Sequence, residues 1–274
     1  MSRACVLLVV VLGVLLSASR AGAFEVKQVG GQAVHWGGPT MPFVLDPSIE
    51  AAVPGGGAAV ASALAAWSGI SGAPKLVVTA GSGGGKAADD GVNTILFAPP
   101  GFAPAGTALA ITLLTVDGDT GEIMDADIVV NGAYAFAVLA ADASSDSAPI
   151  PVEGATTIAA SAGTFDLFHV IAHETGHSLG LGDATSDDAV MYLYTTPGDA
   201  AYRAPASDDE AGLDAIYGAR PEAGCSSASV AGSSAGGRGG CWGAVLALGV
   251  LAGWAAKRRC SLVTVSPSAP RPRR

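Results

Sequence analysis

Two histidines and a glutamate stand at a spacing that can bind and use a metal ion. His173 and His177 are four residues apart, so both imidazoles lie on one face of a helix, about one turn apart. Glu174 is placed to take a proton from a zinc-bound water and pass it to a leaving amine. Gly180 lets the chain turn back, so that Asp183 can supply a third ligand. The pattern predicts a catalytic zinc centre with His173, His177 and Asp183 as metal ligands and Glu174 as the catalytic residue.

The sequence leaves alternatives open around this centre. In one, Asp183 is a solvated turn residue after the helix, and Asp187 or Asp188 takes its role. His169 lies one turn before the pair, but three consecutive turns span about 12 Å, too far for the outer histidines to share one ion. We therefore interpret His169 as a packing residue or a neighbour behind the ligands. His35 is expected at the surface or the edge of the core.

Hydrophobic periodicity indicates the elements that must position these side chains. Apolar residues at helical spacing predict a helix over residues 57–70, a second runs from Thr164 to Gly180, and a third opens at Ser207 with a capping-box spacing. Strands are predicted at 75–79, 92–98, 108–116 and 123–130, and residues 133–163 read as a long surface loop. The order of elements favours an α/β or α+β arrangement with a small sheet, in one domain spanning residues 24–219.

Charge is distributed unevenly along the 274 residues. All 24 acidic side chains lie between Glu25 and Glu222, where only five basic ones occur. A body this acidic repels phosphate, which argues against a nucleic-acid partner. The same region has no cysteine, so its stability cannot depend on disulfides, and neither a cysteine nucleophile nor a thiolate zinc site is available.

Both ends of the chain carry targeting patterns. Residues 1–23 combine Arg3, an apolar run and a small-residue cleavage site, which predicts a secretory signal peptide; a membrane anchor is the alternative. Residues 220–240 form a linker rich in Gly and Ser, residues 241–259 an apolar segment closed by a basic cluster, and residues 260–274 a polar tail. The Gly-Cys motif and basic cluster resemble a myxobacterial C-terminal sorting tail, although the polar extension departs from that pattern. An ordinary C-terminal membrane anchor is the alternative.

The segments FDLFHVIAHETGHSLGLGD, DDAVMYLY and SDDEAGLDAIYG resemble the metzincin metallopeptidases, and within them the matrixins. The resemblance covers roughly residues 33–219. It implies an α+β fold with a small twisted mixed sheet, an active-site helix, a Met turn at Met191 and a C-terminal helix. It also implies that an extended peptide substrate pairs with an edge strand near residues 108–110.

The chain departs from the matrixin pattern in three ways. Asp183 replaces the third histidine, as in some small bacterial metzincins, and lowers the charge of a zinc site from +2 to +1. No propeptide with a zinc-blocking cysteine follows Ala23. Leu193 stands where a proline is expected after the Met turn, which leaves the wall of the specificity pocket undefined. The chain also has too few histidines for the second, structural zinc of vertebrate matrixins.

A dense group of carboxylates allows a second kind of cation site. Its members are Asp117, Asp119, Glu122, Asp125 and Asp127. Structural calcium would stabilise an exported domain without disulfides, whereas a solvated acidic loop is the alternative. The spacing does not match a twelve-residue calcium loop.

These features predict a secreted or surface-anchored zinc endopeptidase, a metalloprotease acting on protein or peptide substrates. We expect a monomer located in the cell envelope or outside the cell, with membrane contact through the C-terminal segment before any processing. The alternatives are a catalytically silent metzincin-fold module for surface binding or adhesion, and a hydrolase of non-peptide amides. The intact Glu174 argues against the silent module, which needs no proton shuttle.

Overall fold

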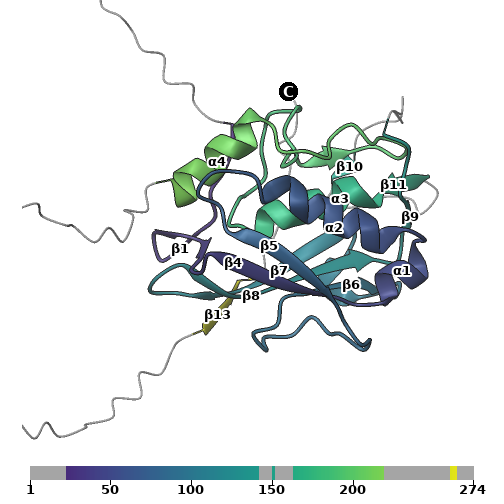
Figure 1. The fold of residues 1–274 in the computed structure, drawn as a ribbon, viewed down its shortest axis with the longest axis horizontal. Helices are drawn as coiled ribbons and strands as arrows, with labels where there is room; N and C mark the ends of the chain where they lie inside the picture. The colour runs from purple at the N-terminus through teal and green to yellow at the C-terminus, as the bar shows by residue number, and fades with distance from the viewer. Residues whose placement is uncertain (1–22, 142–149, 152–162, 219–259, 264–274) are drawn as a thin grey trace, which may run out of the picture.

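A twisted mixed sheet with helices packed against it forms the body of the protein (Figure 1). The computed structural model describes residues 23–141, 150–151, 163–218 and 260–263. The predicted signal peptide up to residue 22, the linker, the hydrophobic segment 241–259 and the end of the tail lie outside the described residues. Within the described residues, no helix has the length and apolar composition needed to cross a membrane.

The main sheet has seven strands in the described part of the chain. They are β3 (His35–Trp36), β4 (Thr40–Leu45), β5 (Lys75–Ala80), β6 (Thr94–Ala98), β7 (Ala110–Asp117), β8 (Glu122–Asn131) and β13 (Cys260–Val263). Their order is β13-β7-β8-β6-β4-β5, with β3 pairing to β8 beside this path. The pairings β4–β5, β4–β6, β6–β8 and β3–β8 are parallel, whereas β7 is antiparallel to both β8 and β13. This is the α+β arrangement with a small mixed sheet that the sequence predicts.

Helices and short ladders complete the domain. The helices are α1 (Ser48–Ala52), α2 (Gly56–Trp67), α3 (Leu167–Ser178) and α4 (Ser207–Tyr217), with a 3₁₀ turn at Ala103–Ala105. The short strands are β1 (Gln28–Val29), β2 (Gln32–Ala33), β9 (Ala135–Ala137), β10 (Ile150–Pro151), β11 (Thr164–Asp166) and β12 (Tyr194–Thr195). They pair as β1–β2, β9–β11 and β10–β12.

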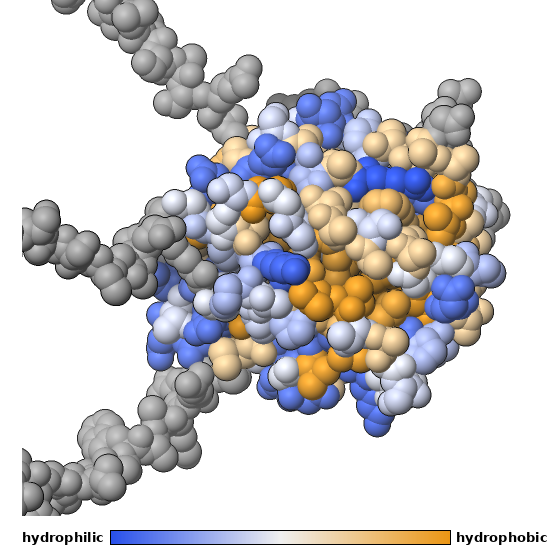
Figure 2. Space-filling model, viewed as in Figure 1, coloured by the Kyte–Doolittle hydropathy of each residue, from blue (hydrophilic) through white to orange (hydrophobic). Residues whose placement is uncertain are grey.

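The core lies between the sheet and the two central helices. α2 packs against α3, and α3 in turn contacts β7 and β8 (Figure 1). Trp67 at the end of α2 is fully buried, and its indole N–H donates to the carbonyl of Ala172 in α3 over 2.9 Å. This bond satisfies the one polar group of a large buried ring and fixes α3 against α2. Figure 2 shows hydrophobic side chains gathered over the outer strand β5, where Val77 and Val78 are half-buried.

The structure corrects several predicted boundaries. The second helix, α3, begins three residues later than predicted. Residues 164–166 pair with β9 as strand β11 before α3 begins. The third helix does begin at Ser207, but the N-cap is Ala206, whose N–H donates to the Asp209 carboxylate over 2.8 Å. Strand β4 was missed because Pro42 interrupts its pattern. Pro42 is tolerated because β6 pairs with β4 only from Val44 onward.

Candidate metal centre

The N-terminus of α3 is fixed by a buried ion pair. Asp166 caps the helix by accepting from the backbone N–H of His169 over 3.0 Å. Nε and one terminal nitrogen of Arg203 each lie 2.7 Å from a different oxygen of the Asp166 carboxylate, which is fully buried. The same guanidinium stacks 5.0 Å from the centre of the Phe168 ring. The helix that carries the two histidines is therefore held at its first turn by charge and packing together.

The C-terminus of α3 ends in a turn that brings the chain back to the histidines. Gly180 has φ +97°, a left-handed conformation that favours glycine, and its N–H bonds to the carbonyl of His177 over 3.0 Å. The N–H of Leu181 bonds to the carbonyl of Gly176 over 3.1 Å. A Cβ on Gly180 would overlap the carbonyl oxygen of Val34. The position therefore requires glycine both for its backbone conformation and for space.

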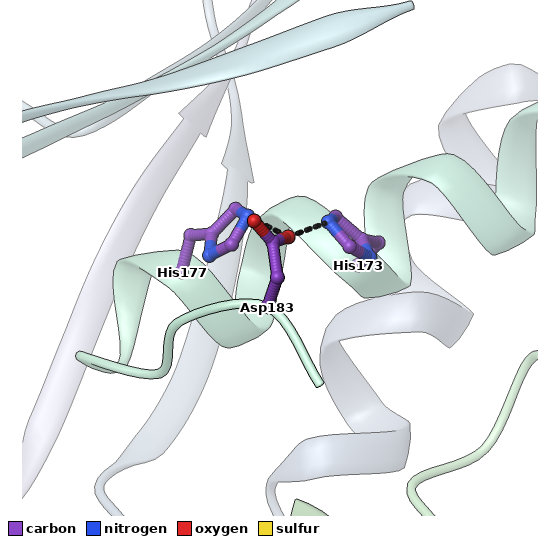
Figure 3. A group of neighbouring side chains, drawn as sticks. All are labelled: His173, His177 and Asp183. Carbon is purple, nitrogen blue, oxygen red and sulfur yellow. Dashed lines mark ion pairs between the residues drawn. The ribbon is translucent and has the colours of Figure 1, made fainter. Parts of the chain in front are cut away.

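Three side chains converge at this point (Figure 3). Asp183 Oδ1 lies 3.5 Å from His173 Nε2 and 3.6 Å from His177 Nε2. Ligands bound about 2.0–2.2 Å from a tetrahedral zinc ion stand about 3.3–3.6 Å apart, so these separations match a shared ion. Within the described residues this is the one group of three His, Cys, Asp or Glu side chains whose ligand atoms lie within 4.8 Å of one another.

Hydrogen bonds of the two histidines fix which nitrogen faces the group. Nδ1 of His173 lies 2.9 Å from the carbonyl of Val190, and Nδ1 of His177 lies 2.9 Å from the carbonyl of Leu181. A carbonyl oxygen only accepts, so each Nδ1 carries a proton, and Nε2 is the nitrogen whose lone pair each ring presents to a metal when the ring is neutral. Backbone acceptors of this kind orient metal-binding histidines in proteins.

Burial and charge in the group also suit a cation. Both histidines are fully buried, and the Asp183 side chain keeps 31% of its surface exposed, which leaves one side of the group open. Burial alone lowers the pKa of His173, but the nearby carboxylates of Asp183 and Glu174 raise it to about 9. Burial raises the pKa of Asp183, yet the two histidines lower it to about 2. The Asp183 carboxylate thus stays charged and is stabilised by a nearby positive charge. Without a metal that charge comes from protonation of His173, and a metal ion would supply it directly.

Glu174 is buried beside the group and is held by strand β7. Its side chain is fully buried, and Oε2 lies 2.7 Å from the hydroxyl of Thr112. Thr112 was not among the residues that the sequence suggested. The one signal in the sequence is a threonine on the otherwise apolar, inward-facing side of strand β7.

The other sequence-predicted candidates lie apart from the group. Asp188 accepts a hydrogen bond from the nearby Ser186 hydroxyl, and neither Asp187 nor Asp188 joins the two histidines. His169 is buried one turn away against Tyr202, and its Nδ1 lies 3.2 Å from the Thr195 hydroxyl. Burial lowers the pKa of His169 to about 3, so the ring is neutral.

A buried loop passes beneath the histidines at Met191, where the Met turn was predicted. Met191 is 1% exposed, and a Cβ on Gly176 would overlap its sulfur, so the loop touches α3 where the helix has no side chain. Asp209 of α4 accepts from the N–H groups of Val190 over 2.8 Å and Met191 over 3.1 Å. The start of α4 thereby fixes the loop whose Val190 carbonyl orients His173.

The predicted carboxylate group divides between two places. Asp117 accepts from the N–H groups of Asp119 and Thr120 over 2.9 and 3.1 Å, and so stabilises the β7–β8 turn. Asp125 and Asp127 instead line a cavity of about 460 Å³ on the face of the sheet opposite α3. Asp127 accepts from the backbone N–H groups of two neighbouring segments, at residues 88 and 94.

The strand predicted to receive substrate lies at one side of the sheet, next to α3. The strand is β7, and β8 borders it on one side. On the other side, β13 pairs with residues 114–117 of β7, in the register Val263↔Leu114 to Cys260↔Asp117. Part of the predicted polar tail therefore lies against this strand. The near half, residues 110–113, has no strand partner on that outer side among the described residues.

The C-terminal part of the domain is similar to known proteins. The family model described as matrixin matches residues 114–218, which include α3, the loop at Met191 and α4. Matrix metalloproteinase-23 of Rattus norvegicus is 35% identical over 104 residues, which cover 37% of this chain and 24% of that protein.

Two further relatives match over shorter stretches. Interstitial collagenase of Bos taurus is 47% identical over 55 residues, and matrix metalloproteinase-20 of Homo sapiens is 44% identical over 57 residues. Each stretch covers 20% of this chain, and 11% and 12% of the respective relative. The chain thus spans about a quarter or less of the length of these relatives. The likeness to matrixins given by the family model is thus confined to the segment that carries α3, the loop at Met191 and α4.

Proposed function

We propose that this protein is a secreted or surface-anchored, zinc-dependent endopeptidase. The observation that carries the proposal is the convergence of His173 Nε2, His177 Nε2 and Asp183 Oδ1 beside the buried Glu174. Two imidazoles and one carboxylate form a donor set found in catalytic zinc sites, which keep a fourth position open for water or substrate. The matrixin match over the same segment supports the assignment.

His173, His177 and Asp183 are the residues that would hold the zinc ion. Their separations suit tetrahedral coordination, both ring tautomers present Nε2, and the aspartate contributes a negative charge. When bound, zinc supplies Lewis acidity, which polarises a substrate carbonyl and makes water a better nucleophile at neutral pH.

Glu174 performs the proton transfers of the proposed reaction. Its carboxylate accepts a proton from the attacking water and then delivers that proton to the nitrogen of the leaving amine. The side chain is excluded from solvent, so the transferred proton is not exchanged with bulk water.

An extended peptide is the substrate that fits the strand beside the site. Residues 110–113 of β7 lie next to α3, and a peptide laid along their outer side would gain main-chain hydrogen bonds. Recognition through the backbone favours unfolded or extended protein segments over small amides. The bound peptide would then pass close to Glu174 of α3, because the Glu174 Oε2 atom lies 2.7 Å from the hydroxyl of Thr112 in β7.

The remaining features of the proposal rest on sequence patterns. We expect export by the N-terminal signal, sorting or anchoring through residues 241–259, and a monomeric enzyme in the envelope or outside the cell. Structural calcium near Asp125 and Asp127 stays a prediction, to be checked by thermal unfolding with and without calcium.

Metal removal and return tests the proposal directly. The full-length chain, stripped by a chelator, should lose cleavage of an unfolded, fluorescently labelled protein and regain it when one equivalent of zinc is added. An Asp183→Ala variant should require a higher zinc concentration for any recovery. A folded, zinc-loaded protein that cleaves neither this substrate nor a mixed peptide library would contradict the proposal and favour a binding module.

A further inference from the structure

Thr112 is a polar side chain on a buried, apolar face of strand β7. It is 1% exposed, and the residues two positions away on the same face, Ala110 and Leu114, are apolar and fully buried. Its neighbour across the β7–β8 pairing is Ile128, which is also fully buried. A hydroxyl left without a partner in such surroundings is destabilising. A threonine in this position therefore calls for a specific partner.

Glu174 is that partner. The Thr112 hydroxyl oxygen lies 2.7 Å from the carboxylate oxygen Oε2 and 2.9 Å from the backbone carbonyl of the same residue. A hydroxyl has one proton and can give it to one acceptor at a time. A bond to an ionised carboxylate is shorter and about twice as strong as a bond to a neutral group, so the proton goes preferentially to Oε2.

We propose that Thr112 is a positioning residue for Glu174, an inference that rests on the proposed peptidase function. The last torsion of a glutamate side chain is broad and poorly restrained, so the carboxylate plane needs a hydrogen bond to fix it. Thr112 holds Oε2 from the sheet side, and Oε1 is then the oxygen that exchanges the proton with water and leaving amine. The strand that receives the peptide and the residue that moves the proton are thereby linked through one side chain.

Three variants of the full-length chain separate this role from a packing role. Thr112→Val keeps the shape and removes the hydroxyl, Thr112→Ser keeps the hydroxyl, and Thr115→Val makes the same change at a buried threonine on the other face of β7. We expect Thr112→Val to lower kcat by about 10- to 100-fold, with KM and zinc affinity unchanged, because a small misplacement of a reacting group has this effect. Thr112→Ser should recover most of the rate, and Thr115→Val should leave it unchanged.

A double-mutant cycle gives an independent check on rate. In a Glu174→Ala background, Thr112→Val should produce no further loss of residual activity, because the group it positions is gone. If Thr112→Val lowers the melting temperature but leaves kcat per folded, zinc-loaded molecule unchanged, Thr112 only packs β7 against α3 and the inference is wrong.

Crystal structures of the zinc-free variants test the inference without any activity. The Glu174 carboxylate should keep its orientation in wild type and Thr112→Ser and should rotate or become spread over several positions in Thr112→Val. An unchanged carboxylate in Thr112→Val overturns the inference, whatever the rates are. If the wild type proves inactive on peptides, the proposed function fails, and these structures still decide whether Thr112 orients Glu174.

Discussion

Replacing Gly180 with alanine should damage both the fold and the metal centre. The φ of +97° costs an alanine about 1–2 kcal/mol. The new Cβ would also overlap the carbonyl oxygen of Val34, a backbone atom of a buried residue that cannot move without its neighbours. Overpacking of this kind costs about 1–3 kcal/mol. The free energy of unfolding should therefore fall by about 2–5 kcal/mol, a large share of the 5–15 kcal/mol typical of a domain.

Gly101→Ala is a matched control for the backbone conformation alone. Gly101 has φ +86°, and a Cβ there would meet no atom within 4 Å. Urea unfolding of the full-length chain, followed by circular dichroism, should give a loss of only about 1–2 kcal/mol for this variant. Zinc affinity, measured by competition with a chelating dye, should fall only in Gly180→Ala, because only that turn brings Asp183 to the histidines.

Two results would refute this reasoning. Equal stability losses in the two variants would show that the contact with Val34 has no energetic cost. Unchanged zinc affinity in Gly180→Ala would show that the turn does not set the position of Asp183.

Further predictions concern charges inside the domain. Arg203→Met leaves the buried Asp166 charge unpaired and should lower the free energy of unfolding by about 3 kcal/mol in urea denaturation; adding Asp166→Asn should recover part of the loss. Asp183→Ala should weaken zinc binding in equilibrium dialysis, because it removes one of the three side chains that would hold the ion. Burial, with Asp90 and Asp89 nearby, raises the pKa of Asp125 to about 6, and burial with Asp125 raises that of Asp127 to about 7. The folded state then binds more protons than the unfolded chain, so without divalent cations stability should fall as pH rises from about 4 to 7, and less so in Asp125→Asn.

The part of the site that lies close together in the chain could be predicted from the sequence. A spacing of four residues fixes the relative position of His173 and His177 once the segment is helical. Gly180 then returns the chain over three residues, so the approach of Asp183 follows from a local turn. The alternatives at Asp187 and Asp188 could be weighed only when the loop geometry was known.

The parts that depend on distant packing could not be predicted. The contact between Thr112 and Glu174 joins residues 62 positions apart and exists only because β7 packs on α3. The sequence around Asp209 indicated a helix start, but not that its carboxylate also binds the backbone of Val190 and Met191, 18 or 19 residues earlier. The sequence did not indicate strand β4, because a proline fits a strand only where no neighbouring strand needs its backbone N–H. Whether that holds at Pro42 depends on where β6 begins to pair with β4, which only the fold shows.

The same dependence on packing explains the start of α3. Thr164 and Asp166 are both residue types that cap helices, so the sequence does not decide between them, and the pairing of residues 164–166 with β9 sets the boundary. The buried pair of Asp166 and Arg203 then holds the first turn, with partners 37 positions apart.

A comparison of wild type with Glu174→Ala at matched zinc content tests most directly whether the protein is a zinc peptidase. Both full-length proteins would be loaded with zinc, assayed for metal by mass spectrometry and given the same unfolded protein substrate. We expect one bound zinc in each protein, cleavage by wild type and a rate at least about 100-fold lower in the variant. Equal cleavage by the two proteins would contradict the proposed role of Glu174, and absence of bound zinc in both would contradict the metal centre itself.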